Sequence, residues 1–365
     1  MERINKTDTL NRVKLTANIL FSGIGCQERG FENSGLFDLE VLNTSDINKD
    51  AVVSYAAVHC GLTKEMIENY SDYPSREEMA AYLKVINFGY EPEKNKSYDW
   101  DKLARRKSND IEKYWLACKL SNNLGDISKI EKLPYADLWT CSFPCTDISL
   151  AGKMKGLSPS DSTRSSLLWE NIRLLKTAKD DGTLPKYIMF ENVKNLVGKK
   201  FINDFNNLLS VLDELGFNSY WKVLNAKNCG VPQNRERVFV ISIRKDIDNG
   251  AFVFPKPFDI GIRLKDILDE NVEEKYYLSE DVQSRFKFTS QDFSKNVIGT
   301  TKPISRSIGQ RDLVYSKESI MGTLVATDYK QPKQVFEQIP NECVQEGNLS
   351  GGKWDKIYES ARRYY

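Results

Sequence analysis

A cysteine and a glutamate each follow a short apolar segment of this chain, and together they could supply a nucleophile and an acid. Cys145 comes directly after Pro144, at the end of the apolar run Asp137–Phe143, and Glu191 follows Tyr187–Phe190. Both runs suit a buried strand and are too short for a core helix. Because a proline cannot donate to a neighbouring strand, Pro144 directs the chain out of the sheet and presents Cys145 at the strand's carboxyl end. A thiol and a carboxyl at one edge of a sheet can share a reaction.

Both side chains also have ordinary structural interpretations. A free cysteine is most often a small buried hydrophobic residue, and a carboxylate at a strand end is often only a solvated surface group. A cysteine hydrolase would need a base, and the only histidine, His59, ends a predicted helix far from the expected site. The rest of the chain must decide whether the two residues act together.

The elements that would position this pair alternate between strand and helix. Strands are predicted at Val13–Phe21, Leu39–Leu42, Tyr220–Ala226 and Val238–Arg244, besides the two apolar runs above. Helices are predicted from Cys26, at Lys49–His59, from Ser75 to about Asn87, at Thr163–Ala178 and at Phe201–Leu215. This order predicts an α/β fold with a doubly wound, mostly parallel sheet, in which ligands bind beyond the carboxyl ends of the strands.

The turn after the first strand could hold a nucleotide-like ligand. Gly23 and Gly25 let the backbone turn tightly and approach a ligand that faces helix amide groups. Glu28 stands where the full dinucleotide fingerprint has a third glycine. Asp46 suits either a ribose hydroxyl pair or a helix N-cap. Asp126 suits either a turn cap or a purine amine. At this point both interpretations stay open for each aspartate.

Length and charge suggest how the rest of the chain is organised. The 365 residues are enough for a large domain with a smaller one, and the strand and helix alternation stops near Phe258, which predicts domains at residues 1–258 and 259–365. The net charge of +1 argues against a surface that is basic all over. Charges of both signs at Glu91–Lys113 predict a solvated surface excursion without chemistry.

One segment concentrates basic residues despite the balanced total charge. Gln233, Arg235 and Arg237 alternate, so that a strand would send all three to one face, where they could bind phosphates or a base edge. A solvated basic edge strand is the alternative.

Cysteine usage and the amino terminus bear on the cellular compartment. The seven cysteines have irregular spacing without a Cys-x-x-Cys pair, which does not suit a disulfide framework or a cysteine zinc site. Met1–Lys14 lacks the apolar core of a signal peptide, and no apolar run is long enough to span a membrane. These features predict a soluble cytoplasmic protein without membrane contact.

Taken in chain order, these segments resemble the DNA (cytosine-5)-methyltransferases of bacteria and phages. The matching segments, over roughly residues 16 to 280, are Phe21–Gly25 (cofactor loop), Asp46 (ribose acid), Gly125–Ile127 (adenine contact), Pro144–Cys145 (nucleophile), Arg164–Leu167 (a structural motif), Glu191–Val193 (acid) and Gln233–Arg237 (support of the flipped base). The resemblance implies an S-adenosylmethionine-dependent, Rossmann-like fold acting on double-stranded DNA, in a restriction-modification or phage protection system. It implies that Phe21, Gly23, Gly25, Asp46, Ile47, Asp126, Ile127 and Pro144 bind S-adenosylmethionine, that Cys145, Glu191, Arg235 and Arg237 are catalytic, and that no metal is required.

The family's chemistry gives Cys145 and Glu191 separate tasks. A Cys145 thiolate would add to C6 of a flipped-out cytosine and make C5 electron-rich, while Glu191 hydrogen-bonds or protonates N3. An ordinary cysteine with a pKa of about 8.5 is only a few per cent thiolate near neutrality, so the site is expected to favour the thiolate. Flipping the base out of the duplex costs a few kcal/mol, and Arg237 more than Arg235 is expected to touch it.

The carboxyl-terminal part departs from the family pattern. The last family motif, which returns beside the cofactor loop, is not found, whereas Arg311–Val335 and Leu349–Trp354 resemble sequence of the target-recognition region. We therefore expect an incomplete recognition domain, and either a truncated product or a split enzyme completed by a second polypeptide. A catalytically incomplete DNA-binding remnant and an RNA cytosine-5 methyltransferase are the alternatives.

Overall fold

The computed structural model describes residues 12–91, 94–145, 148, 167–269, 272–290, 292–302, 309, 312–325, 328, 332–338 and 355–359. The chain divides into two compact units, Met1–Val223 with Arg237–Val253, and Leu224–Glu236 with Phe254–Tyr365. The sequence predicts a single boundary after Phe258 and does not anticipate that the short stretch Leu224–Glu236 belongs with the second unit.

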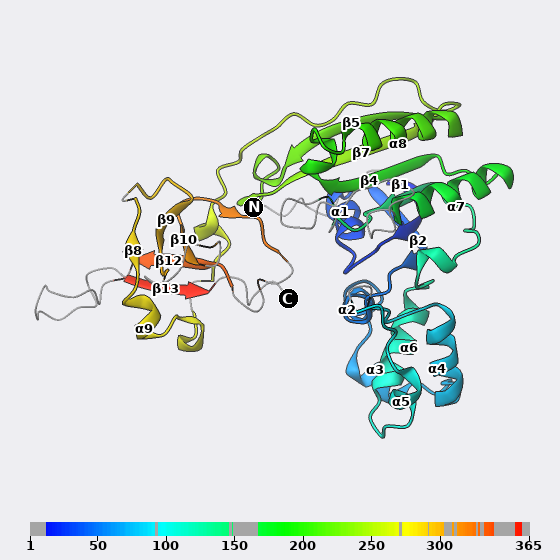
Figure 1. The fold of residues 1–365 in the computed structure, drawn as a ribbon, viewed down its shortest axis with the longest axis horizontal. Helices are drawn as coiled ribbons and strands as arrows, with labels where there is room; N and C mark the ends of the chain where they lie inside the picture. The colour runs from blue at the N-terminus through cyan, green and yellow to red at the C-terminus, as the bar shows by residue number, and fades with distance from the viewer. Residues whose placement is uncertain are drawn as a thin grey trace, which may run out of the picture. The chain divides into compact units, whose positions relative to one another are not determined.

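A six-stranded sheet organises the first unit, in the order β2-β1-β3-β4-β7-β5 (Figure 1). The strands are β1 (Val13–Leu20), β2 (Phe37–Ser45), β3 (Leu138–Cys141), β4 (Tyr187–Val193), β5 (Phe217–Asn225) and β7 (Glu236–Arg244). β1 pairs in parallel with β2 and β3, β3 pairs in parallel with β4, and β7 runs antiparallel to β4. The predicted mostly parallel sheet is confirmed.

Helices cover both faces of this sheet. They are α1 (Cys26–Ser34), α7 (Leu168–Asp180) and α8 (Ile202–Leu215). Leu20 and Trp139 face the same core as α7 and α8, whereas Ala17 and Ile19 lie in a smaller cluster with Phe31 of α1. The period-two alternation along β1 produces this division, because successive side chains point to opposite faces. Gly216 ends α8 in the left-handed conformation, with φ of 103°, as the sequence predicts.

Five further helices form a second core within the first unit (Figure 1). They are α2 (Lys49–His59), α3 (Lys64–Asn69), α4 (Arg76–Val85), α5 (Trp100–Ala104) and α6 (Asp110–Leu120). The predicted capping box is confirmed, since Ser75 and Glu78 bond reciprocally at the start of α4. The prediction that Glu91–Lys113 is a solvated excursion is wrong. Trp100, Leu103 and Ile111 are buried, and their wide spacing among charges hid the apolar stripe.

The second unit contains a five-stranded sheet in the order β13-β12-β10-β9-β8. Its strands are β8 (Lys287–Phe288), β9 (Val297–Thr300), β10 (Leu313–Ser316), β12 (Gln334–Gln338) and β13 (Asp355–Glu359), with a short helix α9 (Glu280–Gln283). A separate ladder joins β6 (Gln233–Asn234) in parallel to β11 (Met321–Gly322). The 3-10 helices of both units are η1 (Ile127–Lys129), η3 (Lys194–Val197), η4 (Ala226–Asn228), η5 (Leu264–Asp266) and η6 (Glu274–Tyr276).

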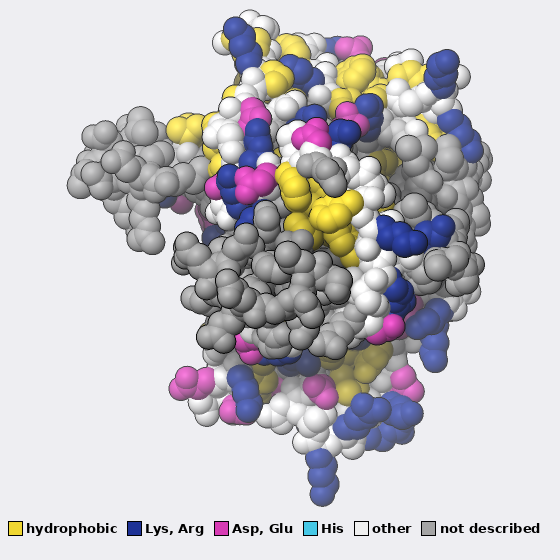
Figure 2. All heavy atoms as spheres, turned by 90° about the vertical axis from the view of Figure 1, so that its left-hand side faces the viewer, with side chains coloured by type: hydrophobic (Ala, Val, Ile, Leu, Met, Phe, Trp, Pro, Cys, Tyr) yellow, Lys and Arg dark blue, Asp and Glu magenta, His cyan; other side chains and the backbone are white. Residues whose placement is uncertain are grey.

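Charge is mixed on the face of the molecule drawn in Figure 2, where Lys and Arg side chains are interspersed with Asp and Glu side chains. This pattern agrees with the nearly balanced composition. Within the described part of the chain, no helix is both long and apolar enough to cross a membrane.

Candidate active site

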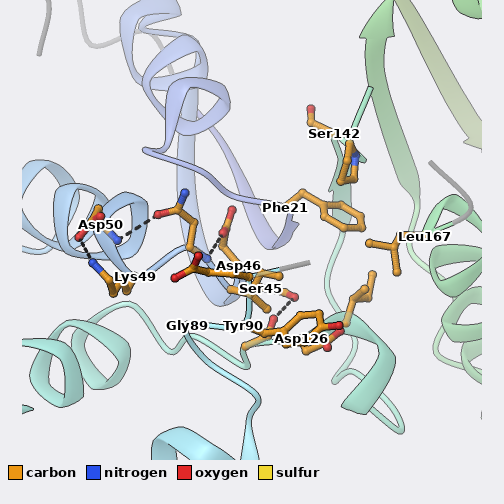
Figure 3. Close-up of a pocket in the computed structure, with 16 residues that line it drawn as sticks. Phe21, Ser45, Asp46, Lys49, Asp50, Gly89, Tyr90, Asp126, Ser142 and Leu167 are labelled. Carbon is orange, nitrogen blue, oxygen red and sulfur yellow. Dashed lines mark hydrogen bonds and ion pairs between the residues drawn. The ribbon is translucent and has the colours of Figure 1, made fainter. Parts of the chain in front are cut away.

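A pocket of about 630 Å³ lies in the first unit, beyond the carboxyl ends of β1, β2 and β3 (Figure 3). Its lining consists of Phe21, Ser45, Asp46, Ile47, Asn48, Lys49, Asp50, Gly89, Tyr90, Glu91, Gly125, Asp126, Ile127, Ser142, Pro144 and Leu167. β1 pairs with β2 on one side and with β3 on the other. The strand order therefore runs to one side of β1 for β2 and to the other side for β3. Such a topological switch point is where open α/β sheets bind ligands.

The turn after β1 is held in an unusual conformation beside the pocket. Phe21 has φ of 57°, a left-handed conformation that an aromatic residue rarely adopts. The amide of Gly23 donates to Oδ2 of Asp46 at 2.9 Å, and the amide of Gly25 donates to the Ser22 carbonyl at 3.0 Å. Figure 3 shows the Phe21 ring near the side chain of Leu167. The turn thus presents an aromatic face to the pocket from a backbone that its neighbours constrain.

Asp46 connects this turn to the end of β2. Besides the Gly23 bond, its Oδ1 accepts the amide of Asn48 at 2.7 Å. Burial raises the pKa of Asp46 above its ordinary value, although backbone amides, including those of Asn48 and Gly23, oppose the shift. Asn48, not Asp46, caps α2, by accepting the amides of Asp50 and Ala51. The N-cap interpretation of Asp46 is therefore wrong, and its spare lone pairs lie at the pocket wall.

Gly125 and Asp126 line the pocket next to the end of β2, where the Ser45 hydroxyl donates to the Gly125 carbonyl at 2.7 Å. Asp126 caps η1 by accepting the Ser128 amide at 2.9 Å, and its other oxygen accepts from Nδ2 of Asn87 at 2.7 Å. The turn-cap interpretation is thus confirmed, and the carboxylate also lines the pocket. Gly125 has φ of 71°, and a Cβ there would lie 2.0 Å from the carbonyl oxygen of Ile86. Only glycine fits this close approach.

Sequence reasoning missed the pocket residues that come from the helical part of the first unit. Gly89 and Tyr90 follow the buried Phe88, and the Gly89 amide donates to the Ile47 carbonyl at 2.9 Å. The available signal was a glycine between two aromatic residues, and this Gly89 has φ of 75° in the structure. Gly25, by contrast, is absent from the pocket lining, because its backbone packs against His59.

Cys145 follows β3 in a loop that two side chains secure. Nδ2 of the buried Asn192, on β4, donates to the Phe143 carbonyl at 2.9 Å. The side-chain amide of Gln27, on α1, donates to the Ser142 hydroxyl. Cys145 itself is partly buried and packs against the main core. The loop is therefore held by one side chain from β4 and one from α1, immediately before the thiol.

Glu191, at the carboxyl end of β4, forms an ion pair with Arg237 of β7. Nε of Arg237 lies 3.0 Å from Oε1 of Glu191, and both side chains are largely buried, with exposed fractions of 18% and 24%. β3 and β4 run in parallel, with Cys141 opposite Phe190. The loop of Cys145 and the carboxylate of Glu191 thus leave the same edge of the sheet. The expected juxtaposition of these two segments is present.

Gln233, Arg235 and Arg237 do not share one continuous strand, contrary to prediction. β6 ends at Asn234 and β7 begins at Glu236. The Asn225 side chain causes this break, since its Oδ1 accepts the amide of Arg235 at 3.0 Å while its Nδ2 donates to Asn234. Arg235 belongs to the second unit and Arg237 to the first. Arg164–Ser166 and Leu349–Trp354 lie outside the described residues.

The pocket suits an adenosine-containing cofactor. Its volume is within the range of small-molecule sites. Asp46 and Asp126 offer carboxylate acceptors in the lining, and Phe21, Ile127 and Pro144 add apolar surface. The mostly parallel sheet with an antiparallel β7 between β4 and β5, and this pocket at its switch point, agree with the Rossmann-like, S-adenosylmethionine-dependent fold that the resemblance implies.

Comparison with known proteins identifies the family. The family model for C-5 cytosine-specific DNA methylases matches residues 75–357. The Type II methyltransferase M2.ScrFI of Lactococcus lactis subsp. cremoris is 42% identical over 71% of this chain and 68% of its own length. The orphan methyltransferase M.SssI of Spiroplasma monobiae is 33% identical over 86% of this chain and 80% of its own length. A solved structure of S. pombe Dnmt2 methyltransferase aligns with a TM-score of 0.47 at 16% identity, over 90% of this chain and 77% of that chain.

This chain belongs to the C-5 cytosine-specific DNA methylase family. It is a DNA (cytosine-5)-methyltransferase, and its methyl donor is S-adenosylmethionine.

Proposed function

We propose that the chain methylates C5 of a flipped-out cytosine in duplex DNA through a covalent bond between Sγ of Cys145 and C6 of the base. The observation that supports this proposal best is the common sheet edge of the Cys145 loop and the Glu191–Arg237 ion pair. It supplies a nucleophile and an acid with a fixed orientation.

The proposed reaction begins and ends with the Cys145 thiolate. The Cys145 thiolate forms a bond to C6, and the displaced electron pair makes C5 nucleophilic while N3 receives a hydrogen bond or a proton from Glu191. When bound, S-adenosylmethionine would supply the methyl group, so that the C5–CH3 bond forms as the S–CH3 bond breaks and S-adenosylhomocysteine is left. A base then removes the C5 proton, the C6–S bond breaks to restore the thiolate, and N3 returns any proton it received to Glu191. Each turnover thus converts cytosine to 5-methylcytosine without a net change in Cys145.

Arg237 and Arg235 have different proposed tasks. The ion pair between Nε of Arg237 and Oε1 of Glu191 holds the Glu191 carboxylate in one orientation. Because the Arg237 side chain is itself largely buried, it also fixes the direction of the second carboxylate oxygen. We propose that Arg237 also contacts the flipped base and that Arg235 supports it from the neighbouring loop. Both roles use a guanidinium, whose several donors can serve a carboxylate and a base together.

Cofactor binding is assigned to residues of the pocket and its turn. Asp46 would accept the ribose hydroxyls, with Ile47 beside it, and Asp126 would accept the adenine amine, with Ile127 beside it. Phe21 and Pro144 would provide apolar contacts, and Gly23 would keep the turn open, since no atom lies within 4 Å of a Cβ built there. Gly25 would act indirectly, by admitting the His59 ring behind the turn.

The relatives' names suggest a biological setting. One relative is a Type II methyltransferase and the other is an orphan methyltransferase. We propose that this chain likewise marks DNA within a restriction-modification or phage protection system.

The test is transfer of labelled methyl from S-adenosylmethionine to mixed-sequence duplex DNA by the purified chain alone. We expect label on cytosine C5 with the parent and none with Cys145→Ser. Cys229→Ser is the matched control, because Cys229 is exposed in the second unit, and it should retain parental activity. Label on RNA but not DNA would overturn the proposed substrate. DNA binding without methyl transfer by the parent would favour the DNA-binding remnant, or a need for a second polypeptide.

A further inference from the structure

Two glutamates and a histidine meet between α1 and α2, on residues that the proposed reaction does not use. Glu28 and Glu32 lie one helical turn apart on α1, and His59 is the last residue of α2. Nδ1 of His59 lies 3.6 Å from Oε2 of Glu28 and 3.4 Å from Oε1 of Glu32. The three ligand-type atoms all lie within 4.8 Å of one another.

His59 is almost completely buried, and its side chain is only 1% exposed. Neither ring nitrogen has a hydrogen-bond partner among the residues that the structure describes. The distances to the two carboxylates are longer than a hydrogen bond between nitrogen and oxygen. Buried polar atoms are nearly always hydrogen-bonded. Nδ1 of His59, which faces two carboxylates, has no such bond among the described residues, so a bound ligand is a reasonable partner for it.

We propose that Glu28, Glu32 and His59 bind a divalent transition metal ion of the zinc type. Zinc accepts imidazole nitrogen and carboxylate oxygen at about 2.0 to 2.2 Å. Tetrahedral geometry then separates two ligand atoms by roughly 3.4 Å. The two distances from Nδ1 of His59, 3.6 and 3.4 Å, are close to this separation, and all three ligand atoms lie within 4.8 Å of one another, so one ion could bridge the three side chains.

Neighbouring side chains would orient these ligands. The Tyr55 hydroxyl donates to Oε2 of Glu28, and Arg29 pairs with Oε2 of Glu32 at 2.6 Å, which leaves Oε1 for the ion. Partners of this kind fix carboxylate ligands in metal sites. The Glu32 side chain is 40% exposed, so water can reach the fourth position.

The ion would connect α1 to α2 directly behind the turn proposed to bind the cofactor. A Cβ at Gly25 would lie 2.1 Å from Nε2 of His59, so the turn and the ring are in close contact. The site is structural rather than catalytic, because its ligands differ from the residues proposed to act on cytosine. Its occupation should therefore change stability independently of methyl transfer.

The experiment measures zinc binding by the full chain after removal of metals with a chelator. We expect about one equivalent of bound zinc in equilibrium dialysis and a higher midpoint of thermal unfolding when zinc is added. Glu32→Gln should weaken binding at least about tenfold. Glu32 is partly exposed on a helix, so this variant should keep the parental circular dichroism spectrum. Glu65→Gln, an exposed carboxylate on α3, is the matched control and should bind zinc as the parent does.

Cobalt provides a second readout that does not depend on stability. Cobalt bound by the three proposed side chains and water should give the visible absorption of a tetrahedral nitrogen and oxygen site, without a thiolate charge-transfer band. Failure of the parent to retain zinc would overturn the proposal. Equal zinc affinity of the parent and Glu32→Gln, or a thiolate band, would also overturn it.

Discussion

Asn192 connects the two strand ends that carry Cys145 and Glu191, and its replacement tests that connection. Its side chain is buried, with 2% exposure, and donates to the Phe143 carbonyl at 2.9 Å while accepting the Val193 amide at 2.8 Å. Asn192→Ala removes both bonds, so the Phe143 carbonyl and the Val193 amide each lose a hydrogen-bond partner. Each lost bond costs about 1 kcal/mol, and more where the abandoned group stays buried. We therefore expect a loss of about 2 to 4 kcal/mol in the free energy of unfolding.

The same change should slow methyl transfer, since the Phe143 carbonyl comes two residues before Cys145. A displacement of about 1 Å in a reacting group can reduce the rate roughly a hundredfold. We expect a lower kcat with little change in the KM for S-adenosylmethionine, because Asn192 is not among the pocket residues. Urea unfolding would measure the stability, and labelled methyl transfer would measure the rate.

Asn207→Ala is the control, because Asn207 is exposed on α8. Its free energy of unfolding should stay within about 0.5 kcal/mol of the parent. If Asn192→Ala matched the parent in both stability and kcat, the assignment of Asn192 as the residue that positions the Cys145 loop would be refuted.

Three further substitutions probe the pocket and the ion pair. Gly125→Ala should destabilise the chain by more than about 1 kcal/mol in urea unfolding, because φ is 71° and the new Cβ would meet the Ile86 carbonyl; parental stability would contradict this close approach. Arg237→Met should lower kcat at least about tenfold in steady-state kinetics by releasing Glu191; an unchanged kcat would exclude the ion pair from catalysis. Burial raises the pKa of Asp46, so folding favours its protonated form. The contribution of Asp46 to the free energy of unfolding is therefore full below the ordinary carboxyl pKa, and it is lost as the pH rises through the raised pKa of the folded state. Cofactor affinity, measured by calorimetry, should fall as acid protonates Asp46 in the parent, and this component should vanish in Asp46→Asn; identical pH profiles would contradict the role of the carboxylate.

The sheet and much of the pocket could be predicted from local sequence. Short apolar runs ending at Pro144 and Glu191 marked the central strands, because a buried strand needs continuous apolar residues and a proline ends its ladder. Asp46 comes shortly after the predicted strand Leu39–Leu42, at the strand end where open sheets bind ligands, whereas Asp126 was marked by the family resemblance. These features depend on neighbours in the chain, which a single sequence displays.

Features that depend on distant contacts could not be predicted in this way. The second core around Trp100 is assembled from short helices whose apolar residues are separated by charges. The break at Arg235 depends on the Asn225 side chain, ten residues earlier in the sequence. His59 comes close to Glu28 and Glu32 only because α1 and α2 pack together. In each case the deciding contact joins residues that no local periodicity relates.

The covalent role of Cys145 is the central claim, and trapping on DNA that contains 5-fluorocytosine tests it most directly. Fluorine at C5 cannot leave as a proton does, so the C6–S bond cannot break after methyl transfer and the adduct accumulates. With S-adenosylmethionine present, we predict a protein–DNA adduct whose modified peptide contains Cys145, and no adduct with Cys145→Ser. Methylation of ordinary DNA without such an adduct, or an adduct on another cysteine, would contradict the claim.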